Sequence, residues 1–296
     1  MWQPEPAWSP VPGGRGTSTV GVWQDGDLVV KRLGAPLPGD PAELSLPRHF
    51  AYWRRAADVA ADRLVESTPG LRALPVLRVE EDDEGITLWH PAVESGELPG
   101  PYVAQALGRF TGADLGDPPW LARSQLADRL IRTERHGGWR TLARTTVADV
   151  ADRLWSRRGH FLAALEALPQ VPQHGDPVPG NLPGRVGDDV LAVDWSTLGI
   201  GPVGADLGYW SLSAREDFEV LLDAYVTGLA AGAADPEQAR LGAQVTAVYT
   251  SLSRAELALA RVADEPGALG AKYRHPSVAP YLRSLQRQFP QLEALL

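Results

Sequence analysis

The sequence predicts an α+β fold in two parts, a small lobe built on an antiparallel sheet and a larger, mainly helical lobe. Strand and turn signals fill the first ninety residues, whereas apolar residues recur at three-and-four spacing beyond Pro99, as in amphipathic helices. A chain of 296 residues can bury enough apolar surface for two lobes. We place a connector near residues 89–97, so that the lobes cover residues 1–92 and 93–296.

The strand signals of the first lobe form two hairpins. Asp25-Gly26 is a strong signal for a tight turn between the first two strands. The acidic segment inside the second hairpin is most simply a solvated turn. In chain order, we expect strands over residues 19–23 and 27–33, a helix over 46–66, and strands over 76–80 and 86–89.

Helix start signals recur along the second lobe. Thr146 with Asp149 resembles a capping box, and Ser213 with Glu216 repeats the pattern. Asp235 opens another helix, with proline in the first turn, where a missing N–H costs nothing. The expected helices cover residues 102–110, 121–133, 146–168, 218–230 and a long segment that starts at Asp235.

Composition excludes several classes of protein. The net charge of −9 argues against a general nucleic-acid binder, which needs a basic surface, and is compatible with a cationic substrate. Without cysteine, the chain has no disulfide, no thiol nucleophile and no cysteine-bound zinc. The first residues lack the pattern of a signal peptide, and the apolar stretch at residues 220–234 is too short to span a bilayer. We therefore expect a soluble, cytoplasmic protein without a nucleic-acid or membrane partner.

One stretch carries the chemistry of the chain. His174-Gly175-Asp176 is followed by Asn181 and, after an apolar run that reads as a strand, by Asp194. Phosphoryl transfer needs a carboxylate that orients the acceptor hydroxyl, together with an amide and a carboxylate that hold Mg²⁺ on the phosphates. The spacing from Asp176 to Asn181 is that of the protein-kinase catalytic loop. These residues predict a kinase.

The first lobe supplies candidate contacts to the nucleotide phosphates. Lys31 lies toward the end of the second expected strand and is one of two lysines against 26 arginines, which favours a phosphate role over a surface charge. Gly14 and Gly16 belong to a glycine-rich turn whose N–H groups could cover phosphates. Taken alone, such a segment is more often just a turn.

The chain resembles the aminoglycoside phosphotransferase and choline kinase-like family, small-molecule kinases with a bilobal, protein-kinase-like fold. The resemblance covers nearly the whole chain, but its specific part is residues 174–208. It rests on the loop from His174 to Asn181, on Val193-Asp194-Trp195, and on Gly201-Pro202 and Ala205-Asp206-Leu207. A protein kinase is less favoured, because no Ala-Pro-Glu segment follows and Asp194 precedes Trp195-Ser196 instead of Phe-Gly.

The resemblance implies roles for the reacting residues. Asp176 is the catalytic base, or at least the group that orients the acceptor hydroxyl. Asn181 and Asp194 hold Mg²⁺, and Lys31 contacts the α- and β-phosphates of ATP or GTP.

Two further residues have supporting roles. His174 is expected to position the loop by hydrogen bonds, with a metal site as the competing interpretation. Asp206 is expected to bond backbone groups of the catalytic region or to cap the following helix, with substrate binding as the alternative.

Several positions depart from the pattern of active relatives. Ala56 stands where a helix glutamate usually orients the strand lysine. Trp89 and Pro91 lie in the connector, where backbone groups normally hold adenine, and Pro91 removes one donor. Gly180 replaces the basic residue that many relatives carry before the asparagine. These departures support an alternative function, a catalytically weak or inactive nucleotide- or ligand-binding protein on the same fold.

The acceptor is expected to be a small molecule with a hydroxyl group, such as an aminoglycoside or an amino alcohol. Tyr209, Trp210, Glu216 and Asp217 are candidate pocket residues, because aromatic faces and carboxylates suit an amine-bearing substrate. The alternative is that Trp210 belongs to the core and Glu216 caps a helix. Sugar and nucleoside acceptors stay open, and the sequence leaves the oligomeric state unknown.

Overall fold

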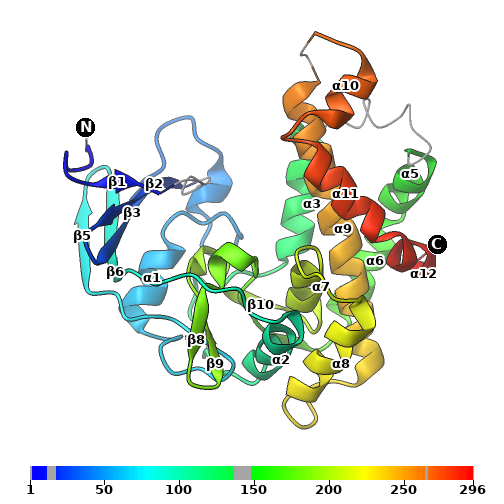
Figure 1. Cartoon of the computed structure of the whole chain (residues 1–296), viewed down its shortest axis with the longest axis horizontal. Coiled ribbons are helices and arrows are strands. Elements are labelled where there is room, and N and C mark those ends of the chain that lie inside the picture. Colours follow the sequence, from blue (N-terminus) through cyan, green and yellow to red (C-terminus); the bar gives the residue numbers. More distant parts are fainter. Residues whose placement is uncertain (1, 12–17, 137–147, 264–265, 296) are drawn as a thin grey trace.

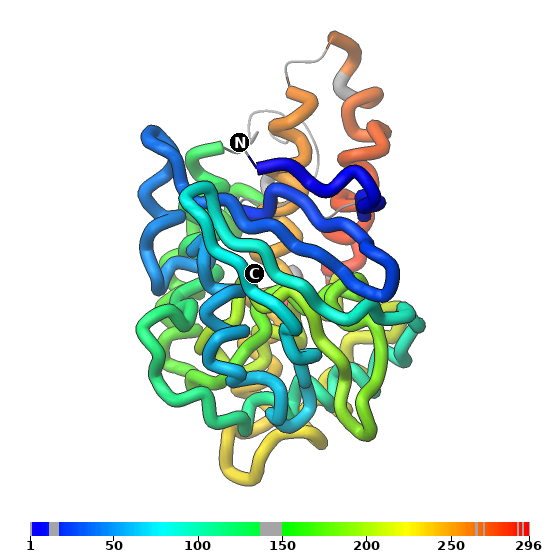
Figure 2. Tube along the Cα trace, turned by 90° about the vertical axis from the view of Figure 1, so that its left-hand side faces the viewer, coloured from blue at the N-terminus to red at the C-terminus, as the bar shows by residue number. Residues whose placement is uncertain are grey.

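The computed structural model describes residues 2–11, 18–136, 148–263 and 266–295. It confirms the α+β class, with an antiparallel sheet on one side of the molecule and helices on the other (Figure 1). In the view turned by 90°, the strands cross in front of the helical part (Figure 2). Within the described ranges, no helix combines the length and apolar character that a bilayer-spanning segment needs.

The sheet has five strands in the order β1-β2-β3-β6-β5, and every neighbouring pair is antiparallel. Gly26 has a φ of 56°, a left-handed conformation that suits glycine, in the turn expected at Asp25-Gly26. Both predicted hairpins are therefore present. The strands are β1 (Ser9–Pro10), β2 (Thr19–Asp25), β3 (Leu28–Gly34), β5 (Arg78–Asp82) and β6 (Gly85–Pro91).

The two faces of the sheet pack against different groups. One face forms a small core with α1 (Arg55–Asp62), whose members are Leu33, Ala57, Ile86 and Leu88. Lys31 lies opposite Leu88 in the register and shares this face, because side chains directly opposite each other in a sheet point the same way. The other face carries the buried Arg32 beneath Trp2, which packs with Trp8 and Trp23.

The helical part includes two small sheets, and the motif residues follow strands of these sheets. In these sheets β7 (Gln170–Gln173) pairs with β10 (Gly199–Pro202), and β9 (Asp189–Leu191) lies between β4 (Leu71–Arg72) and β8 (Gly184–Val186). The helices are α2 (Gly100–Phe110), α3 (Gln125–His136), α5 (Ala148–Ser156), α6 (Arg158–Glu166), α7 (Ala205–Ser211), α8 (Phe218–Gly228), α9 (Pro236–Val262), α10 (Leu269–Arg274), α11 (Ala279–Arg287) and α12 (Phe289–Leu295).

The long helix α9 and the short helix α7 approach each other closely. A Cβ atom on Gly208 would lie 2.2 Å from the carbonyl oxygen of Ala243, so only glycine fits there. Gly204, the N-cap of α7, has a φ of 86° and would meet the Ala239 carbonyl oxygen at 2.1 Å. As expected, α9 follows Asp235, which forms a capping box with Gln238. This contact fixes α7, which carries Asp206 and Tyr209.

Two expected helices are shorter than the sequence pattern indicates. The helix expected over residues 46–66 begins only at Arg55, and it ends where Arg63 takes a left-handed φ of 53°. The helix expected over residues 146–168 divides into α5 and α6 at Arg157, where ψ falls to 0° and the side chain donates to the Leu295 carbonyl. The capping box expected at Thr146 starts outside the described residues.

Glu256 of α9 is a buried carboxyl group in the helical core. Its exposed fraction is 1 %, and neither oxygen has a hydrogen-bond partner among the described residues. Burial raises the pKa of Glu256 to about 8. The folded protein therefore holds this proton at neutral pH, whereas the unfolded chain releases it near pH 4.5.

We expect this carboxyl group to make stability fall with rising pH. Between pH 4.5 and 8 the folded state binds one more proton than the unfolded state, so each unit costs up to about 1.4 kcal/mol. Glu256→Gln has no such cost. From pH 5 to pH 8, urea unfolding should show the variant gaining roughly 3 kcal/mol over the parent protein. A difference between the two proteins that is the same at both pH values would contradict this assignment.

Candidate functional site

Short strands present the motif residues at their ends. β7 ends at Gln173, directly before His174, and pairs with β10 in a register that places Gln173 opposite Gly199. β9 ends three residues before Asp194. Asp194 has φ 59° and ψ 61°, a left-handed conformation that is rare for a residue with a Cβ atom and recurs at functional sites.

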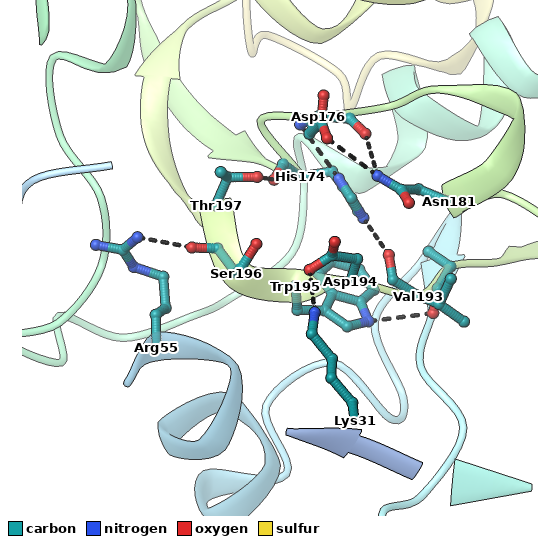
Figure 3. Close-up of polar contacts among 11 residues, drawn as sticks. Lys31, Arg55, His174, Asp176, Asn181, Val193, Asp194, Trp195, Ser196 and Thr197 are labelled. Atoms are coloured by element: carbon teal, nitrogen blue, oxygen red, sulfur yellow. Dashed lines mark hydrogen bonds and ion pairs between the residues drawn. The ribbon is translucent and has the colours of Figure 1, made fainter. Parts of the chain in front are cut away.

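Asp206 and His174 hold the catalytic loop in shape. One carboxylate oxygen of Asp206 accepts from the backbone N–H of His174 at 2.7 Å and the other from Gly175 at 2.9 Å. The buried His174 ring lies 3.0 Å from the Val193 carbonyl oxygen through Nε2 and packs on Trp195 (Figure 3). These contacts tie the loop to the segment that carries Asp194.

Asp176 lies among polar side chains from three segments. The Asn181 amide donates to the Asp176 backbone carbonyl at 2.9 Å and to its carboxylate at 3.2 Å (Figure 3). Tyr209 of α7 hydrogen-bonds to the same carboxylate, and burial raises the pKa of this phenol, although the positive charges of Arg129 and Arg254 oppose the rise. A carboxylate has about four acceptor positions. An acceptor hydroxyl can therefore still bond to Asp176.

Lys31 reaches from the sheet to Asp194 in the helical part. Its ammonium lies 2.6 Å from the Asp194 carboxylate, and its exposed fraction is 8 % (Figure 3). Burial of Asp194 opposes ionisation, but the charge of Lys31 outweighs it and lowers the pKa of Asp194 to about 2. At neutral pH the site thus holds an ammonium and a carboxylate in contact.

Asn181 and Asp194 could hold a metal ion. The Val193 N–H donates to the Asn181 carbonyl at 2.8 Å, which brings the two residues onto adjacent backbone. Because the Asn181 Nδ2 faces Asp176, the side-chain oxygen of Asn181 is left free to coordinate a metal ion. In the described part of the chain, no three acidic, histidine or cysteine residues are grouped as a metal site. An amide and a carboxylate suit Mg²⁺, which keeps several waters and binds phosphate oxygens.

Arg55 on α1 connects that helix to the segment after Asp194. Its guanidinium is fully buried, and burial lowers the pKa of Arg55 to about 10. It donates to five backbone carbonyls, those of Pro47, His49, Phe50, Trp120 and Ser196. At Ala56, where relatives carry a glutamate, α1 offers Lys31 no carboxylate. The glutamates on either side of this position in the sequence bond elsewhere, Glu43 to Arg135 and Glu66 to Arg63. Asp194 itself orients Lys31.

The connector residues are only partly brought to the site. Trp89 lies opposite Val30, one residue out of step with Lys31, so its ring lies on the other face of the sheet beneath Arg78. The side chains of Trp89 and Lys31 therefore lie on opposite faces of the sheet. Pro91 ends β6, as a residue without an N–H can. Gly14 and Gly16 lie outside the described residues.

His90, the neighbour of Trp89 in β6, lies on the same face of the sheet as Lys31. Burial, together with the charge of Lys31, lowers the pKa of His90 to about 4. The ring is therefore neutral at pH 7. Side chains alternate between the two faces along a strand, so the register of β6 with β3 decides that His90 faces Lys31. The sequence does not give this register.

Of the four candidate pocket residues, only Tyr209 lies at Asp176. The Trp210 indole is buried and donates to the Gly100 carbonyl at 3.2 Å. Glu216 accepts from the Gly100 N–H at 2.9 Å, so it satisfies the first turn of α2 instead of α8. Asp217 is the exposed N-cap residue of α8, without a side-chain cap bond. Packing and capping account for Trp210 and Glu216.

Two arginines near Asp176 were not predicted from the sequence. Arg129 of α3 donates to the Gly175 carbonyl at 2.8 Å, and Arg254 of α9 lies 3.9 Å from the Asp176 carboxylate. Their helices lie far from the motif in sequence.

Comparison with known proteins agrees with this geometry. The model of the phosphotransferase enzyme family matches residues 7–242. The chain belongs to this family. Membership confirms the prediction of a phosphotransferase of the small-molecule kinase class. No curated protein sequence gives a significant match to the chain.

Solved structures confirm the kinase-like fold. A choline/ethanolamine kinase family protein from Mesorhizobium loti is 18% identical over 97% of this chain and 92% of that chain, with a TM-score of 0.56. Aminoglycoside phosphotransferase APH(3'')-Id from Streptomyces rimosus, solved with ADP and streptomycin, is 19% identical over 81% and 92%, with a TM-score of 0.51. The GDP complex of aminoglycoside 2'-phosphotransferase-IIIa is 10% identical over 98% and 93%, with a TM-score of 0.58.

We expect Asp206→Asn to loosen the catalytic loop. An asparagine keeps the shape but has one acceptor oxygen for two backbone N–H groups, and its amide hydrogens face the other donor. Unfolding in urea should show a loss of about 2 kcal/mol. The matched control, Asp217→Asn, removes a charge at an exposed position and should change stability by less than about 0.5 kcal/mol. Equal effects of the two substitutions would rule out the proposed role of Asp206.

Proposed function

We propose that this protein transfers the γ-phosphoryl group of ATP or GTP to a hydroxyl of a small molecule, with Mg²⁺ bound. The observation that carries the proposal is the 2.6 Å contact between Lys31 and Asp194 beside the bonded pair of Asp176 and Asn181. Four groups from three segments of the chain thereby form the set that phosphoryl transfer requires. Neighbouring structures that contain ADP or GDP support a nucleotide in this family.

Lys31, Asn181 and Asp194 form the nucleotide end of the proposed site. The Lys31 ammonium, a compact cation on the central strand of the sheet, binds phosphate oxygens. The oxygens of Asn181 and Asp194 hold Mg²⁺, which when bound neutralises phosphate charge. Because Lys31 is held by Asp194, it stays oriented without the helix glutamate that Ala56 replaces.

Asp176 forms the acceptor end of the proposed site. Its carboxylate bonds the acceptor hydroxyl and receives its proton as the new oxygen–phosphorus bond forms and the bond between the γ-phosphorus and the bridging oxygen breaks. The Asn181 amide and the Tyr209 hydroxyl restrict rotation of the carboxylate. Positioning of this kind supplies much of the rate enhancement in phosphoryl transfer.

The first test measures nucleotide binding by thermal shift. ATP or GTP with Mg²⁺ at a hundred times its dissociation constant should stabilise the fold by about 2.7 kcal/mol. Asp194→Asn, which preserves shape, should abolish the dependence of this shift on Mg²⁺, whereas Asp217→Asn should keep it. If neither nucleotide shifts the melting temperature of the parent protein, the alternative of an inactive binding protein gains support from Ala56 and Pro91.

The second test separates chemistry from binding. Asp176→Asn should lower kcat by about 10² to 10⁴, because the acceptor proton loses its carboxylate, and should leave the nucleotide shift intact. Transfer of labelled phosphate from the nucleotide to an acceptor measures kcat. A variant that retains the parent rate would contradict the role of Asp176.

A further inference from the structure

Two guanidinium groups converge on the acceptor end of the site. Arg254 of α9 lies 3.9 Å from one carboxylate oxygen of Asp176, and its guanidinium lies 4.3 Å from the centre of the Tyr209 ring. Arg129 of α3 lies 4.9 Å from the centre of the same ring. Two positive charges thus stand beside the carboxylate that receives the acceptor hydroxyl.

The two arginines differ in how far their donors are used. Arg129 donates to the Gly175 carbonyl and stacks on Phe50 as well as Tyr209, so it has a structural role in the loop. Arg254 has five N–H donors, and within the described ranges none makes a hydrogen bond; the 3.9 Å approach to Asp176 is too long for one. Its side chain is 28 % exposed. Arg254 is therefore a cation fixed by stacking, with donors available to a ligand.

The position of Arg254 constrains the acceptor. A hydroxyl bonded to Asp176 brings the neighbouring atoms of its own molecule close to this guanidinium. An ammonium group there would be repelled, whereas a carboxylate or phosphate would gain charge-assisted hydrogen bonds from a planar fork that fits both. Trp210 and Glu216, which suggested an amine-bearing acceptor, are occupied at α2.

We propose that the acceptor carries an anionic group, a carboxylate or a phosphate, close to the hydroxyl that is phosphorylated, and that Arg254 binds this group. The inference rests on the proposed function and names its substrate class. It replaces the expectation of an aminoglycoside or amino alcohol, which the sequence favoured, and makes Arg254 a specificity-determining residue.

The test compares acceptors that share a carbon frame and differ in charge. The first series is glucose, glucuronate, glucose 6-phosphate and glucosamine, and the second is glycerol, glycerate, glycerol 3-phosphate and serinol. Transfer of labelled phosphate from ATP or GTP gives kcat and KM for each. We expect the anionic members to have the highest kcat/KM. Equal values across charges, preference for the ammonium members, or no transfer to any anionic member would overturn the proposal.

Arg254→Gln identifies the residue responsible. This variant should raise KM for the anionic acceptors by about tenfold to a hundredfold, as expected for lost hydrogen bonds to a charged group, and leave KM for the neutral ones unchanged. Arg240→Gln removes the same charge about 21 Å away on α9 and should leave every KM unchanged. A uniform fall in kcat for all acceptors would instead assign Arg254 to the transferred phosphoryl group and overturn the proposal.

Nucleotide binding separates this proposal from the function on which it rests. The parent protein and Arg254→Gln should both show the thermal shift with Mg²⁺ and nucleotide. If both show the shift but the acceptor series shows no preference for anions, the substrate class is wrong and the kinase function stands. If the parent protein shows no shift, the proposed function itself fails.

Discussion

The ion pair between Lys31 and Asp194 is the contact on which the site depends. It joins the sheet to the helical part, with the Lys31 side chain buried and the Asp194 side chain 38 % exposed. A half-buried ion pair gives little net stability, because desolvation and screening by solvent offset the attraction. The pair instead fixes the geometry of the site. It holds a cation that can bind phosphate next to a carboxylate that can bind a metal ion.

Other contacts reduce the freedom of each partner in this pair. Arg55 ties α1 to the Ser196 carbonyl, two residues beyond Asp194, and His174 bonds the Val193 carbonyl on the other side. The carboxylate of Asp206 accepts hydrogen bonds from the backbone of the catalytic loop. Its helix, α7, contains glycine residues that allow it to pack closely on α9.

The sequence predicted those residues whose spacing along the chain encodes their chemistry. Asp176 and Asn181 lie on one loop, and Asp194 follows a short strand, so local structure brings them together. Arg254 could not be found in this way, because its position depends on how α9 packs across the fold. Glu216 shows the opposite failure: its local pattern indicated a cap for α8, but the unpaired N–H of Gly100 at α2 binds it instead. The face on which Trp89 lies depends on strand register, which composition does not reveal.

The most direct test of the account is a crystal structure with Mg²⁺ and a non-hydrolysable ATP or GTP analogue. The account predicts that the Lys31 ammonium contacts phosphate oxygens while Asn181 and Asp194 coordinate the metal. A complex in which the nucleotide lies elsewhere, with Lys31 and Asp194 still paired and no metal beside them, would contradict it.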